Sequence, residues 1–262
     1  GVAAAEVSSY PTDVTAAMLN ATQQGLATIN AFADAAGATV TAVDVGVGRP
    51  TADMRHESAL TTERFDEITA TAFAAVNDLD TDMLILGELG IGNTTAAATV
   101  TAALAEGEAT MWVGRGTGID DAGLERKRNA VRQSLRRIAG VADPLEILRE
   151  VGGSELVGMA AAAVAARHRS IPIILDGYIC TASMLPLHVA EPTALDYCIV
   201  GHCSAEPGHR LLLEQLEKPP LLDLEMRLGE GSGAMAALPL VKMACAGVVE
   251  VATFDEWFGP AV

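Results

Sequence analysis

The stretch Gly87-Glu88-Leu89-Gly90-Ile91-Gly92-Asn93-Thr94-Thr95 decides the fold. Before it, residues 83–86 form a short apolar run that is typical of a buried strand. After it, the alanine-rich residues 96–105 predict a helix. A strand, a glycine turn and a helix in this order bring the backbone close to a ligand and point free helix-start amides at an anion. The stretch also places the carboxylate of Glu88 at the exit of the strand, where open α/β sheets carry their chemistry.

The glycines alone are equally compatible with an ordinary tight turn between a strand and a helix. The stretch is not a Walker-type phosphate loop, because no Gly-Lys-Ser/Thr follows it. It is also a poor dinucleotide fingerprint, because no third glycine opens the helix. Asn93, Thr94 and Thr95 are residue types that cap helices and that can also face a ligand. The rest of the chain has to decide between these interpretations.

The composition indicates an α/β enzyme of one large domain or of a large domain with a small lobe. The chain has 262 residues, of which half are hydrophobic and few are aromatic. Its net charge of −17 argues against a nucleic-acid groove, which needs a basic face. Local amides and a few basic residues must therefore hold any anionic substrate against a repulsive overall field.

Cysteine usage and hydropathy indicate the cellular compartment of the protein. The four cysteines show no metal-ligand spacing, and reduced thiols of a cytoplasmic protein are expected. The longest apolar run, residues 156–166, is too short to cross a bilayer, and the start of the chain carries no signal segment. We therefore expect a soluble, cytoplasmic protein without a membrane span.

Strand and helix patterns alternate along the chain. We expect strands at 39–45, 83–86, 111–113, 171–175 and 197–200, and helices at 13–36, 62–76, 96–105, 121–139, from 144, from 152 to 167, 181–189, from 207, and 234–248. This alternation predicts a doubly wound, mostly parallel sheet with helices on both faces, a Rossmann-like three-layer arrangement. Residues 1–8 read as a loop with no helix or strand before it, so an N-terminal part of the fold is expected to be missing.

Four glycine-bearing turns follow predicted strands, at 87–92, 114–118, 176–177 and 201–208, and a parallel sheet gathers such turns at one edge. In the last turn, Ser204 could be a donor in an anion cradle or an ordinary helix cap. Glu230 lies between two glycines directly before a predicted helix, where it is free to meet a ligand or is simply an acid at a helix start. Glu88 and Glu230 could supply a general base and its electrostatic partner.

Other side chains offer less chemistry. His202 and His209 lack a third metal ligand, and structural roles are favoured for both. No serine or cysteine lies in a nucleophile elbow. The basic residues of helix 121–139 read mostly as a solvated face. From the residues alone, the chain is a small-molecule enzyme that binds an anion and uses an acidic catalyst.

Six motifs follow one another along the chain. They are Gly87-Glu88-Leu89-Gly90-Ile91-Gly92-Asn93-Thr94-Thr95, Gly116-Thr117-Gly118 with Lys127 beyond it, Gly152-Gly153-Ser154-Glu155-Leu156, Leu175-Asp176-Gly177-Tyr178-Ile179, Ser204-Ala205-Glu206-Pro207-Gly208-His209, and Leu222-Asp223-Leu224 leading into Arg227-Leu228-Gly229-Glu230-Gly231-Ser232-Gly233. Each motif is modest evidence by itself, but the six in this order specifically resemble the nicotinate-nucleotide–dimethylbenzimidazole phosphoribosyltransferase family.

The resemblance implies transfer of phosphoribose from nicotinate mononucleotide to 5,6-dimethylbenzimidazole or a related base, in cobalamin nucleotide-loop biosynthesis. The leaving pyridinium is already cationic, so the reaction needs no metal, and no cofactor is expected. Glu230 matches the family's catalytic base, and Glu88 matches its second active-site glutamate. The resemblance implies substrate-binding roles for the following residues: Leu89, Gly90, Ile91, Gly92, Asn93, Thr94, Gly116, Lys127, Asp176, Ser204 and Leu228.

Within this assignment, Lys127, Gly116 and the amides of 90–93 would hold the phosphate, and the Ser204 loop would hold the nucleotide end. Leu89 and Leu228 would flank the aromatic acceptor. The chain departs from the family at Ala5-Glu6 and at Cys203, and it lacks the family's N-terminal segment, whose last glycine Gly1 resembles.

The resemblance also implies the domain organisation and the oligomeric state. One phosphoribosyltransferase domain would span residues 1–262, with a core at about 37–222 and a small helical lobe from 1–36 and 223–262, and would form a homodimer. A non-catalytic protein that binds a nucleotide or a base remains the alternative. A nicotinamide-dependent oxidoreductase is disfavoured because the Gly-x-Gly-x-x-Gly pattern is missing.

Overall fold

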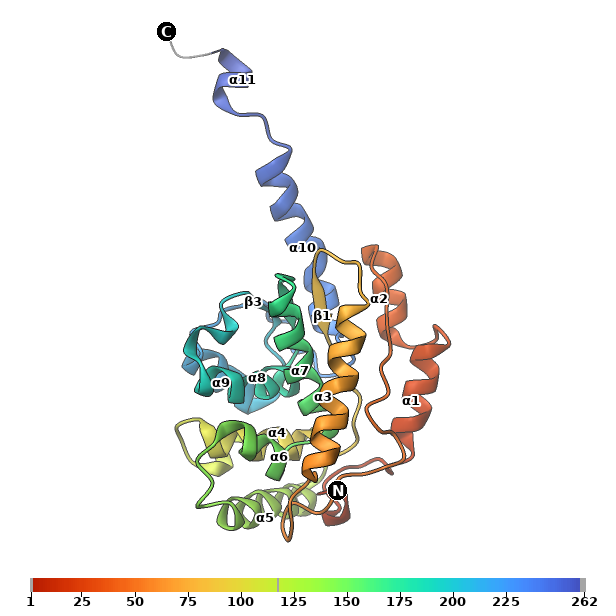
Figure 1. Cartoon of the computed structure of the whole chain (residues 1–262), viewed down its shortest axis with the longest axis vertical. Helices are drawn as coiled ribbons and strands as arrows, with labels where there is room; N and C mark the ends of the chain where they lie inside the picture. Colours follow the sequence, from red (N-terminus) through yellow and green to blue (C-terminus); the bar gives the residue numbers. More distant parts are fainter. Residues whose placement is uncertain (1, 117, 260–262) are drawn as a thin grey trace.

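A computed structural model describes residues 2–116 and 118–259 (Figure 1). Gly1 and Thr117, which belong to the motifs above, lie outside the described residues. A parallel sheet forms the centre of the fold, and its strands are β1 (Leu84–Leu86), β2 (Ile173–Leu175), β3 (Cys198–His202) and β4 (Pro220–Leu222). The strands lie in space in the order in which they occur in the chain.

Helices cover both faces of this sheet, as the α/β prediction requires. In chain order the helices are α1 (Val14–Gln23), α2 (Thr28–Ala36), α3 (Thr62–Asn77), α4 (Asn93–Leu104), α5 (Asp121–Arg137), α6 (Pro144–Val151), α7 (Ser154–His168), α8 (Tyr178–Ala190), α9 (Pro207–Gln215), α10 (Ser232–Val249) and α11 (Phe254–Phe258), with 3-10 turns η1 (Val2–Ala5), η2 (Ala109–Trp112) and η3 (Pro192–Leu195). On one face Ile174 packs against α2 and the first part of α10. On the other, Ile173 and Leu175 join the larger core with α7 and α8. The α/β class is confirmed.

Two strand predictions are wrong. Residues 39–45 run as extended chain without ladder partners, because β-branched residues favour extended backbone but cannot supply the neighbour that a strand needs. Residues 111–113 fall largely in the 3-10 turn η2, where Trp112 is fully buried. The glycine turn at 114–118 therefore follows a helical turn. The short strand β4 was not predicted at all.

Several helix boundaries also differ from the predictions. The helix expected at 13–36 is two helices, because the chain turns at Gly25 with a φ of 77°. Gly37 ends α2 in the left-handed conformation, as expected. Helix α4 begins at Asn93, so Asn93, Thr94 and Thr95 lie in its first turn, and the backbone of Gly92 takes the cap position. The start of the chain, expected as a loop, forms η1.

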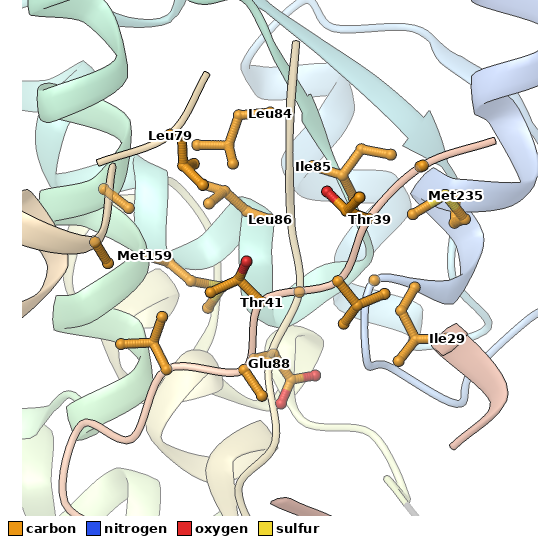
Figure 2. A pocket seen from close by; sticks show the side chains of 18 of the residues that line it. Ile29, Thr39, Thr41, Leu79, Leu84, Ile85, Leu86, Glu88, Met159 and Met235 are labelled. Atoms are coloured by element: carbon orange, nitrogen blue, oxygen red, sulfur yellow. The ribbon is translucent and has the colours of Figure 1, made fainter. Parts of the chain in front are cut away.

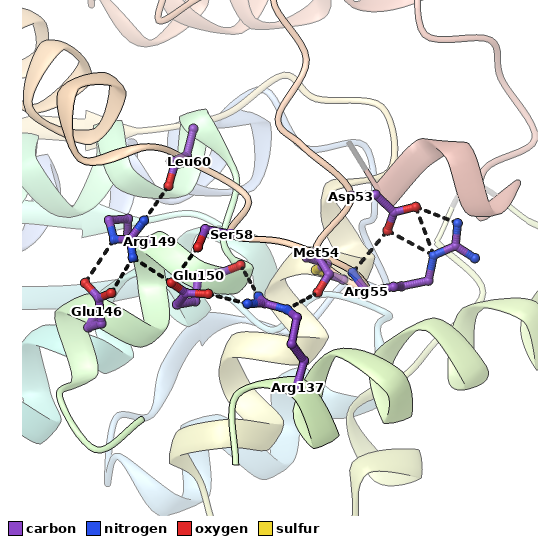
Figure 3. Close-up of polar contacts among 9 residues, drawn as sticks. All are labelled: Asp53, Met54, Arg55, Ser58, Leu60, Arg137, Glu146, Arg149 and Glu150. Carbon is purple, nitrogen blue, oxygen red and sulfur yellow. Dashed lines mark hydrogen bonds and ion pairs between the residues drawn. The ribbon is translucent and has the colours of Figure 1, made fainter. Parts of the chain in front are cut away.

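A network of charges fixes the loop that connects the extended segment to α3 (Figure 3). The buried carboxylate of Glu150 binds Arg137, Arg149 and Ser58, the last with an Oγ–Oε1 distance of 2.6 Å. Arg137 also donates to the carbonyl of Met54 at 2.8 Å. The solvated-face interpretation of helix α5 thus fails for Arg137, which ties α5 to α6 and to this loop.

Helix α10 leaves the body of the protein and carries α11 at its tip (Figure 1). Its first turns are buried, whereas the side chains from Pro239 onward are mostly exposed. The helix is long and apolar enough to cross a membrane by length and composition alone, and a third of it is buried inside the protein. One such helix is weak evidence for a span, since core helices of soluble proteins have the same composition.

Candidate active site

Glu230 is presented by a turn with unusual backbone geometry. Gly229, Glu230 and Gly231 have φ angles of 85°, 64° and 84°, so three successive residues are left-handed. For a glutamate this conformation is strained, and such strain collects at functional sites. The Glu230 amide donates to the Glu88 carbonyl at 3.2 Å, and a Cβ at Gly87 would overlap the backbone of Glu230 and Gly231. The predicted pair of glutamates is therefore brought together by direct packing of the two turns.

The Glu88 side chain lies directly after β1, where Asn93 of α4 donates a hydrogen bond to it. Burial raises the pKa of Glu88 to about 8, and the charges of Glu155, Asp176 and Glu230 add to the shift, against the opposing Asn93 hydrogen bond. Glu88 thus retains its proton at neutral pH in the free protein. In this form it can donate a hydrogen bond as well as accept one.

Two further glutamates of this carboxyl cluster also have raised pKa values. For Glu230 the main cause is burial; a hydrogen bond from the Ile29 backbone opposes it, and the charge of Asp176 adds to it. For Glu155 at the start of α7 the main cause is also burial. One Glu230 oxygen has no hydrogen-bond partner among the described residues. A carboxylate with a raised pKa and a free oxygen suits a general base that works near neutral pH.

Lys127 forms the opposite, cationic end of the site. Its side chain on α5 is 0% exposed, and its Nζ lies 2.7 Å from Thr94 Oγ1 and 3.0 Å from the Gly114 carbonyl. Burial lowers the pKa of Lys127 to about 8, and the charge of Glu206 opposes that shift. The Lys127 ammonium therefore contacts the glycine loop at Gly114.

Glu206 takes part in this cationic end, although the sequence analysis gave it no role. Its Oε1 accepts a hydrogen bond from the Gly116 amide at 2.9 Å, and its Oε2 has no partner among the described residues. The amide predicted to hold a phosphate thus holds a carboxylate in the free protein. The signal available in the sequence was the position of Glu206 directly before the proline that opens α9.

Ser204 lies next to His209 and does not cap α9. The Ser204 amide donates to Nδ1 of His209 at 2.9 Å, and the other ring nitrogen lies 3.0 Å from Thr181 Oγ1. Burial lowers the pKa of His209 to about 3, so the ring stays neutral. A polar hollow of about 690 Å³ opens beside Ser204 and is lined by Arg210 and Asp223.

The first turn of α4 joins the two ends of the site. Asn93 contacts Glu88 at the carboxyl end, and the next residue, Thr94, contacts Lys127 at the cationic end. The start of α4 also supplies the positive end of its helix dipole, although the Ile91 amide is already bound to Thr15 Oγ1 at 3.2 Å. The start of α4 therefore lies between the carboxyl end and the cationic end.

An apolar cavity of about 600 Å³ reaches the carboxyl end (Figure 2). It lies between β1, the extended segment that includes Thr39 and Thr41, and helices α7 and α10. Glu88, Leu89 and Glu230 line the same cavity. The predicted residue Leu228 is 52% exposed and is not part of the lining.

Asp176, to which the resemblance assigned a substrate-binding role, contacts backbone amides in this structure. It is 2% exposed, and both of its carboxylate oxygens accept backbone amides of α10 and the preceding turn. Glu155 belongs to the carboxyl cluster, although the sequence analysis did not single it out. It was quoted within a motif, and its available signal was a carboxylate that follows two glycines at the start of an otherwise buried, alanine-rich helix.

Proteins that are similar to this chain in sequence are named as phosphoribosyltransferases. A family model described as Phosphoribosyltransferase matches residues 1–257. The nicotinate-nucleotide–dimethylbenzimidazole phosphoribosyltransferases of Mesorhizobium japonicum and Cereibacter sphaeroides are 46% and 44% identical over 257 residues. The chain belongs to the nicotinate-nucleotide–dimethylbenzimidazole phosphoribosyltransferase family. Each of these alignments covers 98% of this chain and 76% of the relative.

A solved member of this phosphoribosyltransferase family has the same architecture. The crystal structure of CobT from Thermus thermophilus superposes with a TM-score of 0.94 at 39% identity, over 100% of this chain and 84% of that one. The family resemblance expected from the six motifs is confirmed, and so are the fold and the class of enzyme that it implied.

The raised pKa of Glu88 predicts a pH-dependent stability. A carboxyl group whose pKa is raised on folding stabilises the protein fully below about pH 4.5, its ordinary pKa, and loses this contribution as the pH rises toward 8. The variant Glu88→Gln stays neutral throughout. We expect similar melting temperatures for both proteins at pH 5, and a variant that melts at least ~3 °C higher at pH 8.5. Differential scanning calorimetry measures both.

The exposed Glu57→Gln is the matched control and should show no such pH-dependent difference. A parent and a Glu88→Gln variant whose melting temperatures differ by the same amount at both pH values would contradict the assignment.

Proposed function

We propose that this chain transfers phosphoribose from nicotinate mononucleotide to a benzimidazole base, and releases α-ribazole 5′-phosphate and nicotinate. The observation that carries the proposal is the division of one site into two ends. Glu88 and Glu230 meet at the carboxyl end, and Lys127 and the Gly116 amide meet at the other, with the start of α4 between them. The names of the relatives support the same reaction.

The residues suit each part of this chemistry. A ring nitrogen of the base attacks the anomeric carbon, and the bond to the pyridinium nitrogen breaks as nicotinate leaves with the electron pair. The other ring nitrogen loses its proton to Glu230, whose raised pKa makes it an effective base near neutral pH. Glu88, protonated in the free protein, helps to hold the reacting groups. Attack opposite the leaving group inverts the anomeric carbon and gives the α linkage.

Binding follows from the two ends of the site. The phosphate would displace the Glu206 carboxylate from the Gly116 amide and lie over the buried Lys127. Ser204 and the polar hollow beside it would hold the nucleotide. The flat base would enter the apolar end of the cavity beside Leu89, with Leu228 at its rim.

The test is to mix the protein with nicotinate mononucleotide and 5,6-dimethylbenzimidazole and to detect both products by mass spectrometry. Glu230→Gln removes the base but retains the shape of the side chain. We expect it to lower kcat by at least ~100-fold without lowering the melting temperature. A near-normal rate would eliminate Glu230 as the base, and bound nucleotide without any product in the parent would favour the non-catalytic alternative.

Lys127 should contribute to the binding of the nucleotide and not to the binding of the base. Lys127→Met retains most of the buried volume but removes the charge. We expect the KM for nicotinate mononucleotide to rise by ~10-fold or more, and the KM for dimethylbenzimidazole to change by less than ~3-fold. Steady-state kinetics with each substrate varied in turn measures both. The exposed Arg136→Met on the same helix is the control, and equal effects on the two substrates would contradict the assignment.

We also infer that the protein is a homodimer. Beyond Pro239, α10 and α11 expose a series of apolar side chains, among which Trp257 is 65% exposed, and a second copy could cover them. Light scattering should give twice the chain mass of 27.1 kDa. Trp257→Asp should shift the mass toward the monomer, whereas Leu145→Asp on α6 should not; a monomeric parent would refute the inference.

A further inference from the structure

Asp176 connects the end of β2 to the start of α10. It directly follows β2, and its Oδ1 accepts the Ala234 amide at 2.9 Å and its Oδ2 the Gly231 amide at 3.2 Å. With 2% of its surface exposed, it is among the most buried carboxylates of the described chain. Both carboxylate oxygens of Asp176 thus accept hydrogen bonds from the backbone.

The two amides belong to the segment that follows Glu230. The first amides of a helix have no hydrogen-bond partner within the helix. A buried carboxylate at this point therefore forms strong, charge-assisted hydrogen bonds with them. On the other side, the Glu230 amide is bound to the Glu88 carbonyl. The turn is therefore held between the ends of two neighbouring strands, by a side chain at β2 and by the backbone after β1.

His202 supports Asp176 from a third strand. It ends β3 and is 3% exposed, and its Nε2 lies 3.3 Å from Asp176 Oδ1. Its ring packs against Gly233 in the first turn of α10 and forms an edge contact with the ring of His209, with centroids 6.3 Å apart. Asp176 is thus enclosed by β3 and α10 and does not line the apolar cavity.

We propose that Asp176, supported by His202, is a positioning residue that holds the Glu230 turn against the sheet and does not contact substrate. The proposal rests on the proposed function of Glu230, and it replaces the expectation that Asp176 binds substrate. Asp176 acts through the start of α10. By holding this helix start at a fixed distance from β1, it places Glu230 within reach of the acceptor base.

The first experiment compares kinetics of the parent with Asp176→Asn, which retains the size but replaces one acceptor by a donor. The Gly231 or Ala234 amide then lacks its partner. A misplacement of about 1 Å costs ~100-fold in rate, so kcat should fall by about this factor while KM for nicotinate mononucleotide stays within ~3-fold. Asp143→Asn is the matched control, because Asp143 binds two amides at the start of α6, and it should leave kcat unchanged.

A double-mutant cycle separates positioning from general damage. If Asp176 acts through Glu230, then Asp176→Asn should lower kcat by less than ~3-fold when Glu230→Gln is already present. The full ~100-fold loss in that background would overturn the proposal. A raised KM for the nucleotide with an unchanged kcat would also overturn it, because that pattern indicates direct substrate contact.

Amide hydrogen exchange tests the hydrogen bonds from the Gly231 and Ala234 amides to Asp176 in the parent protein. This test therefore remains possible even if the Asp176→Asn variant does not fold. The Gly231 and Ala234 amides should exchange at least ~100-fold more slowly than the Leu145 and Glu146 amides, which an exposed aspartate binds at the start of α6. Equal exchange rates would overturn the proposal. Slow exchange in a protein without any turnover would instead show that these hydrogen bonds exist and that the proposed function has failed.

Discussion

The site depends on a backbone constraint at Gly229-Glu230-Gly231, three residues that are all held in the left-handed region. Such a turn does not persist alone, because a glutamate there is strained; the surroundings must determine its conformation. Here the determining contacts come from the Glu88 carbonyl, the Asp176 carboxylate and the hydrogen-bonded start of α10. The parallel sheet matters to the chemistry mainly because it brings the ends of β1, β2 and β3 to one edge, where each contributes one of these contacts or supports one.

Charge is separated within the site in a way that the overall composition conceals. A protein with a net charge of −17 repels anions at long range, yet the cationic end offers a buried ammonium, a loop amide and the start of a helix. At the other end, burial raises the pKa values of the carboxyl groups and their mutual repulsion adds to the shift, so that part of their charge is absent at neutral pH. Two adjacent residues in the first turn of α4 contact the two ends of the site. Asn93 binds Glu88 at the carboxyl end, and Thr94 binds Lys127 at the cationic end. An anionic nucleotide and a neutral base are the substrates that such a division suits.

The sequence predicted most helices and three of the four strands, and it singled out Glu88 and Glu230 as a pair in glycine-bearing turns. Periodicity and glycine placement are local signals, so these features could be found without the structure. Prediction failed where a neighbour distant in sequence decides the outcome. Residues 39–45 have strand composition without a strand partner, and β4 is too short to be distinguished from a loop. The role of Asp176 could not be predicted either, since a carboxylate at a strand end reads as a ligand group until its amide partners from α10 are known. Lys127 was singled out through a family motif, whereas its complete burial on a helix rich in basic residues had no local signal.

The pairing of the strands has a consequence for the order of folding. Leu84 pairs with Ile173, and Ile173 pairs with Cys198, so joining β1 to the sheet closes a far longer loop than joining β3. Long loops cost more entropy to close and slow the steps that depend on them. The compact unit of β2, α8 and β3 is thus favoured to form first, and β1 docks onto it late. Since Glu88 directly follows β1 and the Glu230 turn is held at the ends of both β1 and β2, the contact between the two glutamate turns depends on this late docking step.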